Sequence, residues 1–376
     1  MTTLARLGGM LEALAARQRL RQLQPREGLD FASNDYLGLA DSEALREAAQ
    51  SALARGVSLG AGGSRLLRGN HPEHQALEFE AAAFFGTEAA LYMGGGFQSN
   101  QAIFSTLPAA GDLILHDELI HASAHEGMRL GRAETRGFAH NDIEDAKQVL
   151  STWRAEGNGG QIWIAVESVY SMEGDIAPLA DLAALARNES AILIVDEAHA
   201  TGVFGPQGQG LAHGLDAEIL TLHTCGKALG VSGGLICGAT VIIDTLINKA
   251  RPFIFATAPT PLNAALVRAS LRQMQNQPTL VSGASNRMMH AHSEAKRLCG
   301  LDGFESQILP VIVGPDGATM ARAKELQSQG FDIRGIRPPT VPKGTSRLRV
   351  SITGNVTHAD ITSLFKAISQ QQAEAA

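Results

Sequence analysis

The stretch Ile192-Leu193-Ile194-Val195-Asp196-Glu197-Ala198-His199 is an apolar run that ends in two acids and, two residues further on, a histidine. A continuous run of branched apolar residues is typical of a strand that is covered on both faces of a sheet. A second such run, Ile219–Thr224, leads into Cys225-Gly226-Lys227. Lys227 lies 31 residues after Asp196 (227 − 196), far enough for one crossover connection between neighbouring strands. The pattern therefore places an acid, an imidazole and an amine at strand ends.

These three groups suit one kind of cofactor chemistry. Pyridoxal phosphate enzymes use an acid to pair with the pyridinium nitrogen and a lysine to form a Schiff base. The plain alternative for Lys227 is a solvated surface group, as most lysines are. Its neighbours Gly226, Ala228 and Leu229 are small or apolar. Burial among them would favour the neutral, nucleophilic form of the amine.

Helical and strand patterns alternate from Glu43 to about Leu222. Continuous apolar runs predict strands at Ala89–Met93, Asp112–His116, Gln161–Glu167, Ala191–Asp196 and Ile219–Thr224. Helices are predicted between and around them at Glu43–Arg55, Glu73–Phe85, Gln98–Ser105, Asp142–Arg154 and Leu179–Arg187. This alternation predicts an α/β fold with a largely parallel sheet and right-handed crossovers.

The pattern changes after three prolines between Pro252 and Pro261. Helices are predicted at Leu262–Gln275, Ser285–Leu298 and Ala318–Ser328, strands at Ser306–Val313 and Arg347–Ile352, and a last helix from a capping box at Thr357. The basic N-terminus predicts a surface helix at Leu4–Leu23. We therefore divide the chain into an N-terminal helix and arm (1–40), a large domain (41–264) and a smaller α+β domain (265–376).

Composition and charge exclude several classes of protein. The 376 residues are 44% hydrophobic and 18% charged, which is a globular composition. A net charge of −7 disfavours a nucleic-acid scaffold, which usually has a basic face. No apolar run approaches the ~20 residues that span a bilayer. The three cysteines, Cys225, Cys237 and Cys299, have neither disulfide nor zinc spacing, so a reducing cytoplasm is the expected location.

Gly94-Gly95-Gly96-Phe97 follows a predicted strand and precedes a predicted helix. Backbone amides at such a helix start bind anions, although a flexible turn would have the same composition. A dinucleotide-binding loop would need a third glycine where Ser99 stands. Gly60-Ala61-Gly62-Gly63-Ser64 fails the same comparison because Arg65 follows it. An NAD-dependent oxidoreductase is therefore disfavoured.

Two further motifs resemble sites of other protein classes, a helicase motif and a zinc-binding histidine pair. Asp-Glu-Ala-His also occurs in helicases, but the upstream phosphate loop that they require is missing, and the one Gly-Lys pair is followed by Ala228. His121 and His125 have the i, i+4 spacing of a zinc pair, but the glutamate of H-E-x-x-H is absent. A structural or stacking role for His121 is favoured over a metal site.

Arg347 and Arg349 alternate with Leu348 and Val350 on one predicted strand, so both arginines face the same side. That side is either a solvated strand face or a carboxylate-binding surface, which the planar guanidinium group suits.

Taken together, the motifs resemble those of the α-oxoamine synthases, pyridoxal phosphate enzymes with the aspartate-aminotransferase fold (fold type I). The resemblance covers nearly the whole chain, in order. It runs through Ser33–Leu39, Gly62–Leu66, Gly96-Phe97, His121–Ser123, Ser171–Asp175, Asp196–Gly202, Thr224–Lys227 and Arg347–Arg349. It implies a large domain with a mostly parallel seven-stranded sheet between helices, a smaller α+β C-terminal domain, and pyridoxal 5'-phosphate as cofactor.

The resemblance implies roles for residues around the cofactor ring. Lys227 would carry the cofactor and later act as a base, and Asp196 would keep the pyridinium nitrogen protonated. His199 and Ser171 would contact the phenolic oxygen. His121 would stack on the ring.

It implies further roles at the phosphate and the substrates. The amides of Gly96 and Phe97, with Thr224, would hold the ring and phosphate. Thr257 would reach the phosphate of a neighbouring subunit, which makes the expected assembly a homodimer with active sites at its interface. Arg349 would bind the amino-acid carboxylate. Candidates for the acyl-CoA end are Arg21, Arg337 and Thr340.

The expected reaction is a decarboxylative condensation of an amino acid with an acyl thioester. Within the family, the resemblance at Ser33–Leu39 and Arg337–Pro342 implies L-alanine with pimeloyl-CoA or a pimeloyl-carrier protein as substrates. A family member that uses glycine as the donor is the first alternative. A non-catalytic cofactor-binding relative is disfavoured because the expected site residues are all present: Lys227, Asp196, His199 and Arg349.

Overall fold

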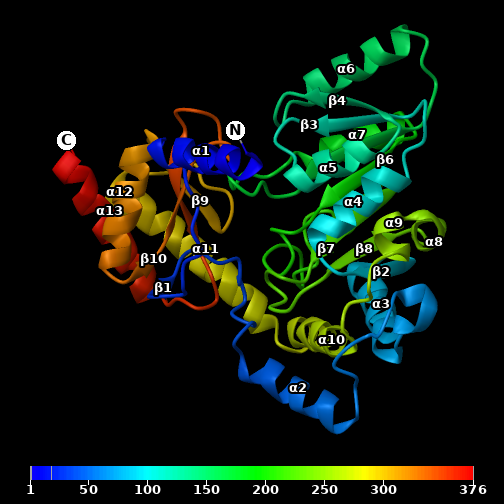
Figure 1. The fold of residues 1–376 in the computed structure, drawn as a ribbon, viewed down its shortest axis with the longest axis horizontal. Helices are drawn as coiled ribbons and strands as arrows, with labels where there is room; N and C mark the ends of the chain where they lie inside the picture. The colour runs from blue at the N-terminus through cyan, green and yellow to red at the C-terminus, as the bar shows by residue number, and fades with distance from the viewer. Residues whose placement is uncertain (1, 18, 376) are drawn as a thin grey trace. The chain divides into compact units, whose positions relative to one another are not determined.

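The computed structural model describes residues 2–17 and 19–375 and contains two compact units (Figure 1). The core unit consists of Asn34–Ser171 and Asp175–Ser285. The C-terminal unit consists of the chain up to Ser33, Met172–Gly174 and the chain from Asn286 onward. These bounds differ from the predicted division at residues 40 and 264, because the long helix α11 (Pro278–Cys299) runs through the boundary and the N-terminal arm joins the C-terminal unit.

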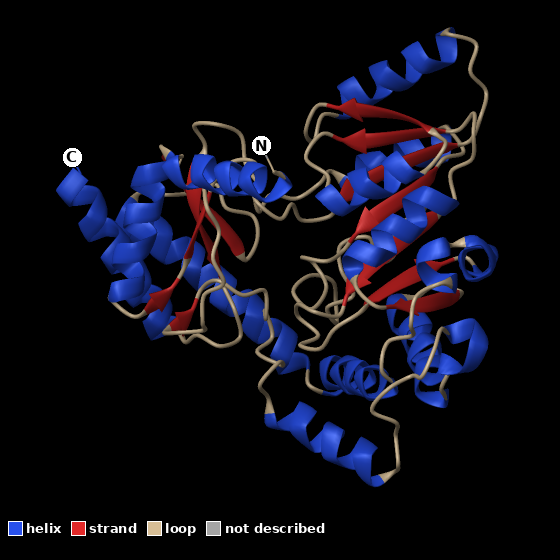
Figure 2. Ribbon diagram, viewed as in Figure 1, coloured by secondary structure: helices blue, strands red, loops and turns tan. Residues whose placement is uncertain are grey.

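The core unit is built on a seven-stranded sheet among the described residues, shown in red in Figure 2. The strand order is β2 (Ala89–Met93), β8 (Gly234–Gly238), β7 (Ile219–Thr224), β6 (Ile192–Asp196), β5 (Ile162–Glu167), β3 (Leu113–Asp117) and β4 (Glu134–Phe138). Strands β7, β6, β5, β3 and β4 are parallel, whereas β8 is antiparallel to both β2 and β7. The predicted mostly parallel sheet of an α/β fold is confirmed.

Both faces of this sheet are buried, which explains the continuous apolar strands. Ile194 of β6 packs in a cluster with residues of α4 (Gly96–Thr106), α5 (Ala122–Leu130) and α8 (Thr240–Lys249). Its neighbours Leu193 and Val195 pack in a second cluster with α6 (Ile143–Ala155) and α7 (Leu179–Asn188). Alternate residues of one strand thus enter opposite cores.

Two strands of this sheet were not predicted, and both have compositions that hide them. The strand β4 is a polar edge strand, Glu134-Thr135-Arg136-Gly137-Phe138, whose first residues are exposed. The strand β8 is short and has glycine at both ends. It begins after Gly233, whose φ of 116° suits glycine alone. A Cβ added to Gly233 would lie 2.3 Å from the ring of Tyr92.

The remaining helices of the core unit begin and end at recognisable signals. They are α2 (Glu43–Ala54), the single π turn η1 (Arg65–Gly69), α3 (Pro72–Phe85), α9 (Arg251–Ile254) and α10 (Pro261–Asn276). The hydroxyl of Ser42 caps α2, and Thr260 caps α10 ahead of a proline at the first helical position. Gly86 ends α3 in the left-handed conformation.

The C-terminal unit is a small α+β structure, as predicted. A three-stranded antiparallel sheet has the order β11 (Arg334–Ile336), β12 (Ser346–Ser351), β9 (Ile308–Gly314), and β1 (Leu29–Asp30) pairs in parallel with β10 (Phe331–Asp332). The helices α12 (Asp316–Ser328) and α13 (His358–Ala375) contribute Leu326 and Phe365 to its core.

The predicted helix at Leu4–Leu23 is too long. Helix α1 (Thr3–Ala16) is capped by Thr2, and residues 19–27 are irregular, while residue 18 lies outside the described residues. Within the described chain, no helix is both long and apolar enough to cross a membrane. All three cysteines are free thiols.

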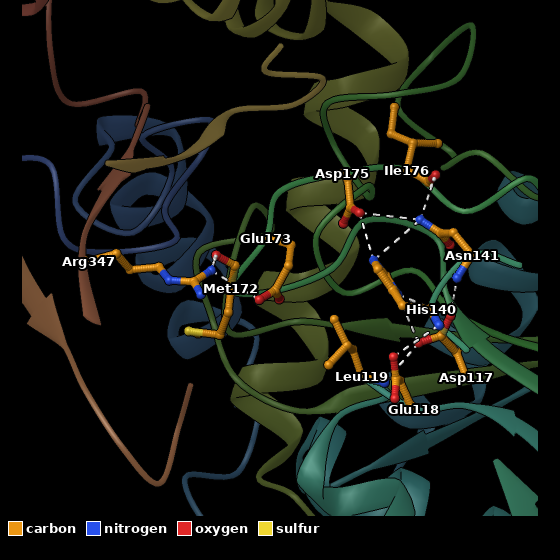
Figure 3. A network of polar contacts seen from close by, with 10 residues as sticks. All are labelled: Asp117, Glu118, Leu119, His140, Asn141, Met172, Glu173, Asp175, Ile176 and Arg347. Carbon is orange, nitrogen blue, oxygen red and sulfur yellow. Dashed lines mark hydrogen bonds and ion pairs between the residues drawn. The ribbon is translucent and has the colours of Figure 1, made fainter. Parts of the chain in front are cut away.

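A network of charged groups holds the loop that follows β5 (Figure 3). His140, just after β4, contacts Asp117 at the end of β3 (Nδ1 to Oδ1, 3.0 Å) and Asp175 (Nε2 to Oδ2, 2.7 Å). Burial alone would lower the pKa of His140, but its bonds to the two carboxylates outweigh burial and raise the pKa to about 10. An imidazolium ion therefore bridges the two carboxylates at neutral pH.

The tip of the same loop, Met172–Gly174, belongs to the C-terminal unit. There Arg347 of β12 donates to the Met172 carbonyl (3.1 Å) and pairs with the Glu173 carboxylate (3.0 Å; Figure 3). An added Cβ on Gly174 would lie 2.1 Å from the Ile308 carbonyl oxygen, so only glycine allows this approach. Arg347 is therefore a structural anchor of the loop.

We expect His140→Gln to lower the free energy of unfolding by about 2 kcal/mol at pH 6, less than the loss for a fully buried ion pair because the ring is partly accessible. The folded pKa of about 10 lies above the ordinary value of 6.5. The stabilisation is therefore complete below pH 6.5 and is lost as the pH rises through 10. Urea denaturation at pH 6 and pH 10.5 measures it.

The exposed His358 provides the control, since His358→Gln should leave stability unchanged at both pH values. A deficit for His140→Gln that is equally large at pH 10.5 would contradict a charged His140.

Candidate active site

The ends of β6 and β7 bring the predicted lysine and histidine into contact. Because the two strands are parallel neighbours, their carboxyl ends lie at the same edge of the sheet. Nζ of Lys227 lies 2.7 Å from Nε2 of His199. Lys227 stands in a tight turn, in which its carbonyl accepts from the Gly230 amide and the Cys225 amide donates to the Gly233 carbonyl. The lysine is half-buried and its amine is held in place.

Asp196 is fixed at the end of β6 by two hydrogen bonds. Its Oδ2 accepts from the Asn100 side chain (2.8 Å) and its Oδ1 from the Ala198 amide (3.0 Å), and the residue is 8% exposed. The adjacent acid, Glu197, is fully buried and bonds to Ser168 and the Ala212 amide. Burial raises the pKa of Glu197 to about 7. Of the two acids at the end of β6, Asp196 is thus the one that bonds to a side chain of α4, and Glu197 is the one bound within the interior.

A chain of hydrogen bonds joins Asp196 to His121. The amide of Asn100 also donates to Ser123 Oγ (2.9 Å), which lies 2.7 Å from Nδ1 of His121. That nitrogen accepts from the Ser123 backbone amide, which sets the ring at the start of α5. The surrounding protein desolvates the imidazole and lowers the pKa of His121 below its ordinary value, although the residue as a whole is exposed and the Asp196 charge acts in the opposite direction. A neutral, oriented imidazole suits the predicted stacking role.

The glycine-rich loop forms an open helix start. No side chain caps α4, so its first amides are available to an anion. An added Cβ on Gly95 or Gly226 would meet nothing within 4 Å, whereas on Gly96 it would meet Thr224 Oγ1 at 3.2 Å. Gly96 and Thr224 are thus in contact, with open space beside them. This space, the uncapped amides, the amine and the buried carboxylate fit the phosphate, aldehyde and ring nitrogen of pyridoxal phosphate.

Three further predicted cofactor residues lie elsewhere in the core unit. Phe97 follows Gly96 in the first turn of α4 and its side chain is 53% exposed. Thr257 is exposed and lines a small hollow with Gly94 and Gln98. Ser171 is half-buried in the loop that His140 holds. No group of three metal-ligating side chains occurs among residues 2–17 and 19–375.

The predicted amino-acid ligand, Arg349, lies in the C-terminal unit. It follows Arg347 by two residues on β12, and both arginines are buried rather than on a solvated strand face. Arg347 is neutralised by Glu173, whereas Arg349 donates to the Ser351 hydroxyl (2.7 Å). The buried, planar guanidinium group of Arg349 is of the kind that binds a ligand carboxylate.

The three residues predicted for the acyl-CoA end come together in the same unit. Arg21 donates to Thr340 Oγ1 (3.2 Å), and Arg337 donates to the Leu20 carbonyl (3.0 Å). The buried Nε of Arg337 has no hydrogen-bond partner among the described residues. Burial and the nearby Arg21 charge lower the pKa of Arg337 below its ordinary value. Two adjacent cations and an unused donor suit a phosphate-rich ligand.

Three further residues of the candidate site were not predicted, namely Asn100, Ser123 and Tyr36. The hydroxyl of Tyr36 lies 2.6 Å from Nδ1 of His199. Asn100 follows Gly96 by one helical turn and is a polar residue on a buried helix face, which is a usable signal. Tyr36 and Ser123 stand within quoted motifs, but nothing in one sequence shows which nitrogen or oxygen they meet.

Comparison with known proteins identifies relatives along almost the whole chain. Residues 26–368 match the family model described as aminotransferase class I and II. A protein from Geobacillus kaustophilus, named putative 8-amino-7-oxononanoate synthase, is 41% identical over 89% of this chain and 86% of its own length. Further relatives named 8-amino-7-oxononanoate synthase are 37–40% identical.

Solved structures have the same fold. A serine palmitoyltransferase with pyridoxal phosphate superimposes with a TM-score of 0.90 at 27% identity, covering 100% of this chain and 99% of that one. An 8-amino-7-oxononanoate synthase from Francisella tularensis superimposes with a TM-score of 0.75 at 27% identity over 93% of this chain and 98% of that one. The chain therefore belongs to the class I and II aminotransferase family, in its α-oxoamine synthase branch.

Proposed function

We propose that this protein is an 8-amino-7-oxononanoate synthase of biotin biosynthesis. It condenses L-alanine with pimeloyl-CoA, or with a pimeloyl-carrier protein, and releases 8-amino-7-oxononanoate, CO2 and the thiol of the acyl donor, either CoA or the carrier protein. The observation that carries this proposal is the set of relatives with that name at 37–41% identity over about nine tenths of the chain. The paired Lys227 and His199 beside a buried Asp196 supply the groups that such an enzyme needs.

The residues of the core unit would hold pyridoxal phosphate, which supplies an electron sink for the charge that develops at the substrate Cα. Lys227 would bind the cofactor aldehyde, and Asp196 would keep the ring nitrogen protonated. His199 and Ser171 would orient the phenolic oxygen, and His121 would cover the ring. Gly96, Phe97 and Thr224 would hold the ring and phosphate.

Lys227 also moves a proton. Its neutral Nζ would take the Cα proton of bound alanine, so one residue would serve as anchor and base. The protonated amine would later return a proton to carbon, after CO2 has left. The contact with His199 keeps Nζ oriented between these two steps.

The C-terminal unit supplies the substrate contacts in this proposal. Arg349 binds the alanine carboxylate, and Arg21, Arg337 and Thr340 bind the CoA end of the acyl donor. Thr257 completes the phosphate site of a second subunit, so the working form is a homodimer with its active sites at the interface. The exposure of Thr257 supports this role.

A second candidate function has its own support. The serine palmitoyltransferase structure superimposes more closely than the 8-amino-7-oxononanoate synthase structure, with TM-scores of 0.90 and 0.75. The two enzymes share their cofactor apparatus, so the shape of the fold does not discriminate between their substrates. The sequence identities favour the first function, because the relatives that carry its name reach 41% and the palmitoyltransferase reaches 27%.

Release of CoA from a panel of substrates tests the proposed function. L-Alanine, glycine and L-serine are each combined with pimeloyl-, succinyl-, acetyl- and palmitoyl-CoA. We expect the highest kcat/KM for alanine with pimeloyl-CoA, by about tenfold or more over the other pairs. Faster release with glycine or serine would transfer the assignment to another α-oxoamine synthase.

Two substitutions separate the roles of the lysine and the acid. Lys227→Ala should abolish the adduct that borohydride traps and lower turnover at least about a thousandfold. Asp196→Asn should keep the adduct but slow exchange of the alanine Cα proton with solvent deuterium, because the electron sink is weakened. The exposed Lys249 gives the matched control, Lys249→Ala. Normal exchange in Asp196→Asn would refute the role of the carboxylate.

Arg349→Ala should raise the KM for alanine about tenfold to a hundredfold, the value of a hydrogen bond to a charged group. The KM for pimeloyl-CoA should change little. Arg334, the register partner of Arg349 on β11, pairs with Asp332 and provides the control Arg334→Ala. Equal effects of Arg349→Ala on both substrates would contradict a specific carboxylate contact.

A further inference from the structure

Tyr36 and Asn34 extend the contact between Lys227 and His199 into a chain of hydrogen bonds inside the core unit. Nε2 of His199 faces the Lys227 amine at 2.7 Å, and Nδ1 faces the Tyr36 hydroxyl at 2.6 Å. The Tyr36 hydroxyl in turn lies 3.0 Å from Asn34 Oδ1, to which it donates. His199 and Tyr36 are buried. The amine of Lys227 thus stands at one end of a defined chain of donors and acceptors.

The direction of these hydrogen bonds determines where His199 carries its proton. Tyr36 has one hydroxyl proton, and it is donated to Asn34 Oδ1. Toward His199 the Tyr36 oxygen then acts as an acceptor, which favours a proton on Nδ1 of the ring. A neutral imidazole has only one N–H. Nε2 then presents a lone pair to Lys227, which is the partner that an ammonium donor needs.

The loop that carries Tyr36 is held rigidly. Asp35 Oδ1 accepts from the Leu39 amide (2.9 Å), which closes the turn. An added Cβ on Gly230 would lie 2.6 Å from the Ala40 nitrogen, and one on Gly202 would lie 3.0 Å from Leu37. The turn of Lys227 and the loop after His199 therefore pack directly against residues 37–40. This packing holds the backbone next to Tyr36 in place.

We propose that Tyr36, oriented by Asn34, is a positioning residue that fixes the proton of His199 on Nδ1 and so keeps Nε2 as the acceptor for the Lys227 amine before the cofactor binds. His199 takes a proton from Nζ, which leaves a neutral amine and an imidazolium ion, and the positive charge moves from one residue to the other. The neutral amine is the form that attacks an aldehyde. Tyr36 thereby controls how readily the chain takes up its cofactor, a consequence that rests on the proposed function.

The proton position is measured first, in cofactor-free protein labelled with ¹⁵N-histidine. We expect the His199 signals of the unaltered chain to show a protonated Nδ1 and an unprotonated Nε2. In Tyr36→Phe the two nitrogens should move toward averaged values, because the acceptor is lost. The opposite ring form in the unaltered chain, or unchanged signals in Tyr36→Phe, would overturn the proposal.

Cofactor uptake is measured second, by mixing cofactor-free protein with pyridoxal phosphate and following absorbance and borohydride trapping. Tyr36→Phe should load about fivefold more slowly, the factor that an ordinary hydrogen bond represents. Tyr92→Phe is the matched control, because Tyr92 is also buried and its hydroxyl donates to the Ser232 carbonyl (2.7 Å) away from His199. Equal slowing in both variants would reduce the effect to general loosening of the fold and overturn the proposal.

Two substitutions of Asn34 test the direction of the chain without removing the tyrosine. Asn34→Ala should reproduce the averaged His199 signals and the slower loading, and Asn34→Asp, which keeps an acceptor oxygen, should restore both. Normal signals and loading in Asn34→Ala would refute the role of Asn34. These results do not depend on which substrates the enzyme uses. An unaltered chain that loads pyridoxal phosphate but does not condense alanine with pimeloyl-CoA would refute the proposed function and leave this inference intact.

Discussion

The parallel pairing of β6 with β7 is the constraint on which the site depends. It sets Asp196 opposite Leu222 in register and brings the turn of Lys227 to the edge where β6 ends. The crossover between the strands contains His199, so one pairing places the acid, the imidazole and the amine. The two apolar clusters keep this pairing in place, because a shift by one residue would exchange the cores that Ile194 and Val195 enter.

Asp196 and Glu197 are neighbours at this edge, but they make different contacts because their surroundings differ. Asp196 keeps an amide donor on each oxygen and stands at the start of a chain that reaches His121. Glu197 points into the interior and fastens the loop near Ala212 to Ser168. The carboxylate that we propose for the cofactor ring and the carboxylate that anchors a loop are thus consecutive residues.

Much of the fold followed from apolar patterning, since strands buried on both faces leave a clear trace in the sequence. The exceptions have physical reasons. The strand β4 has one solvated side, and β8 owes its place to the close approach of Gly233 to Tyr92 rather than to its own composition. The unit boundary was not predictable either, because α11 continues through it without any break in helical pattern.

The site was predictable at the level of residue types and less so at the level of partners. Lys227, His199 and Asp196 follow from strand ends and a resemblance. The hydrogen bonds of Asn100 and Tyr36 depend on contacts between segments far apart in the sequence, which a single chain of letters does not record. Likewise Arg347 and Arg349 look equivalent as alternating residues, and only the Glu173 contact distinguishes a structural arginine from one suited to a ligand.

The C-terminal unit is discontinuous, and this bears on how the chain folds during synthesis. Its strand β1 emerges from the ribosome long before its partner β10, and the Glu173 that neutralises Arg347 is made roughly midway between them. A fragment beginning at Asn286 would lack β1, the partner of β10, and the buried Arg347 would lack the carboxylate of Glu173. The N-terminal strand β1 can therefore pair only after the last segment of the polypeptide has been made. We expect the core unit to fold before the C-terminal unit.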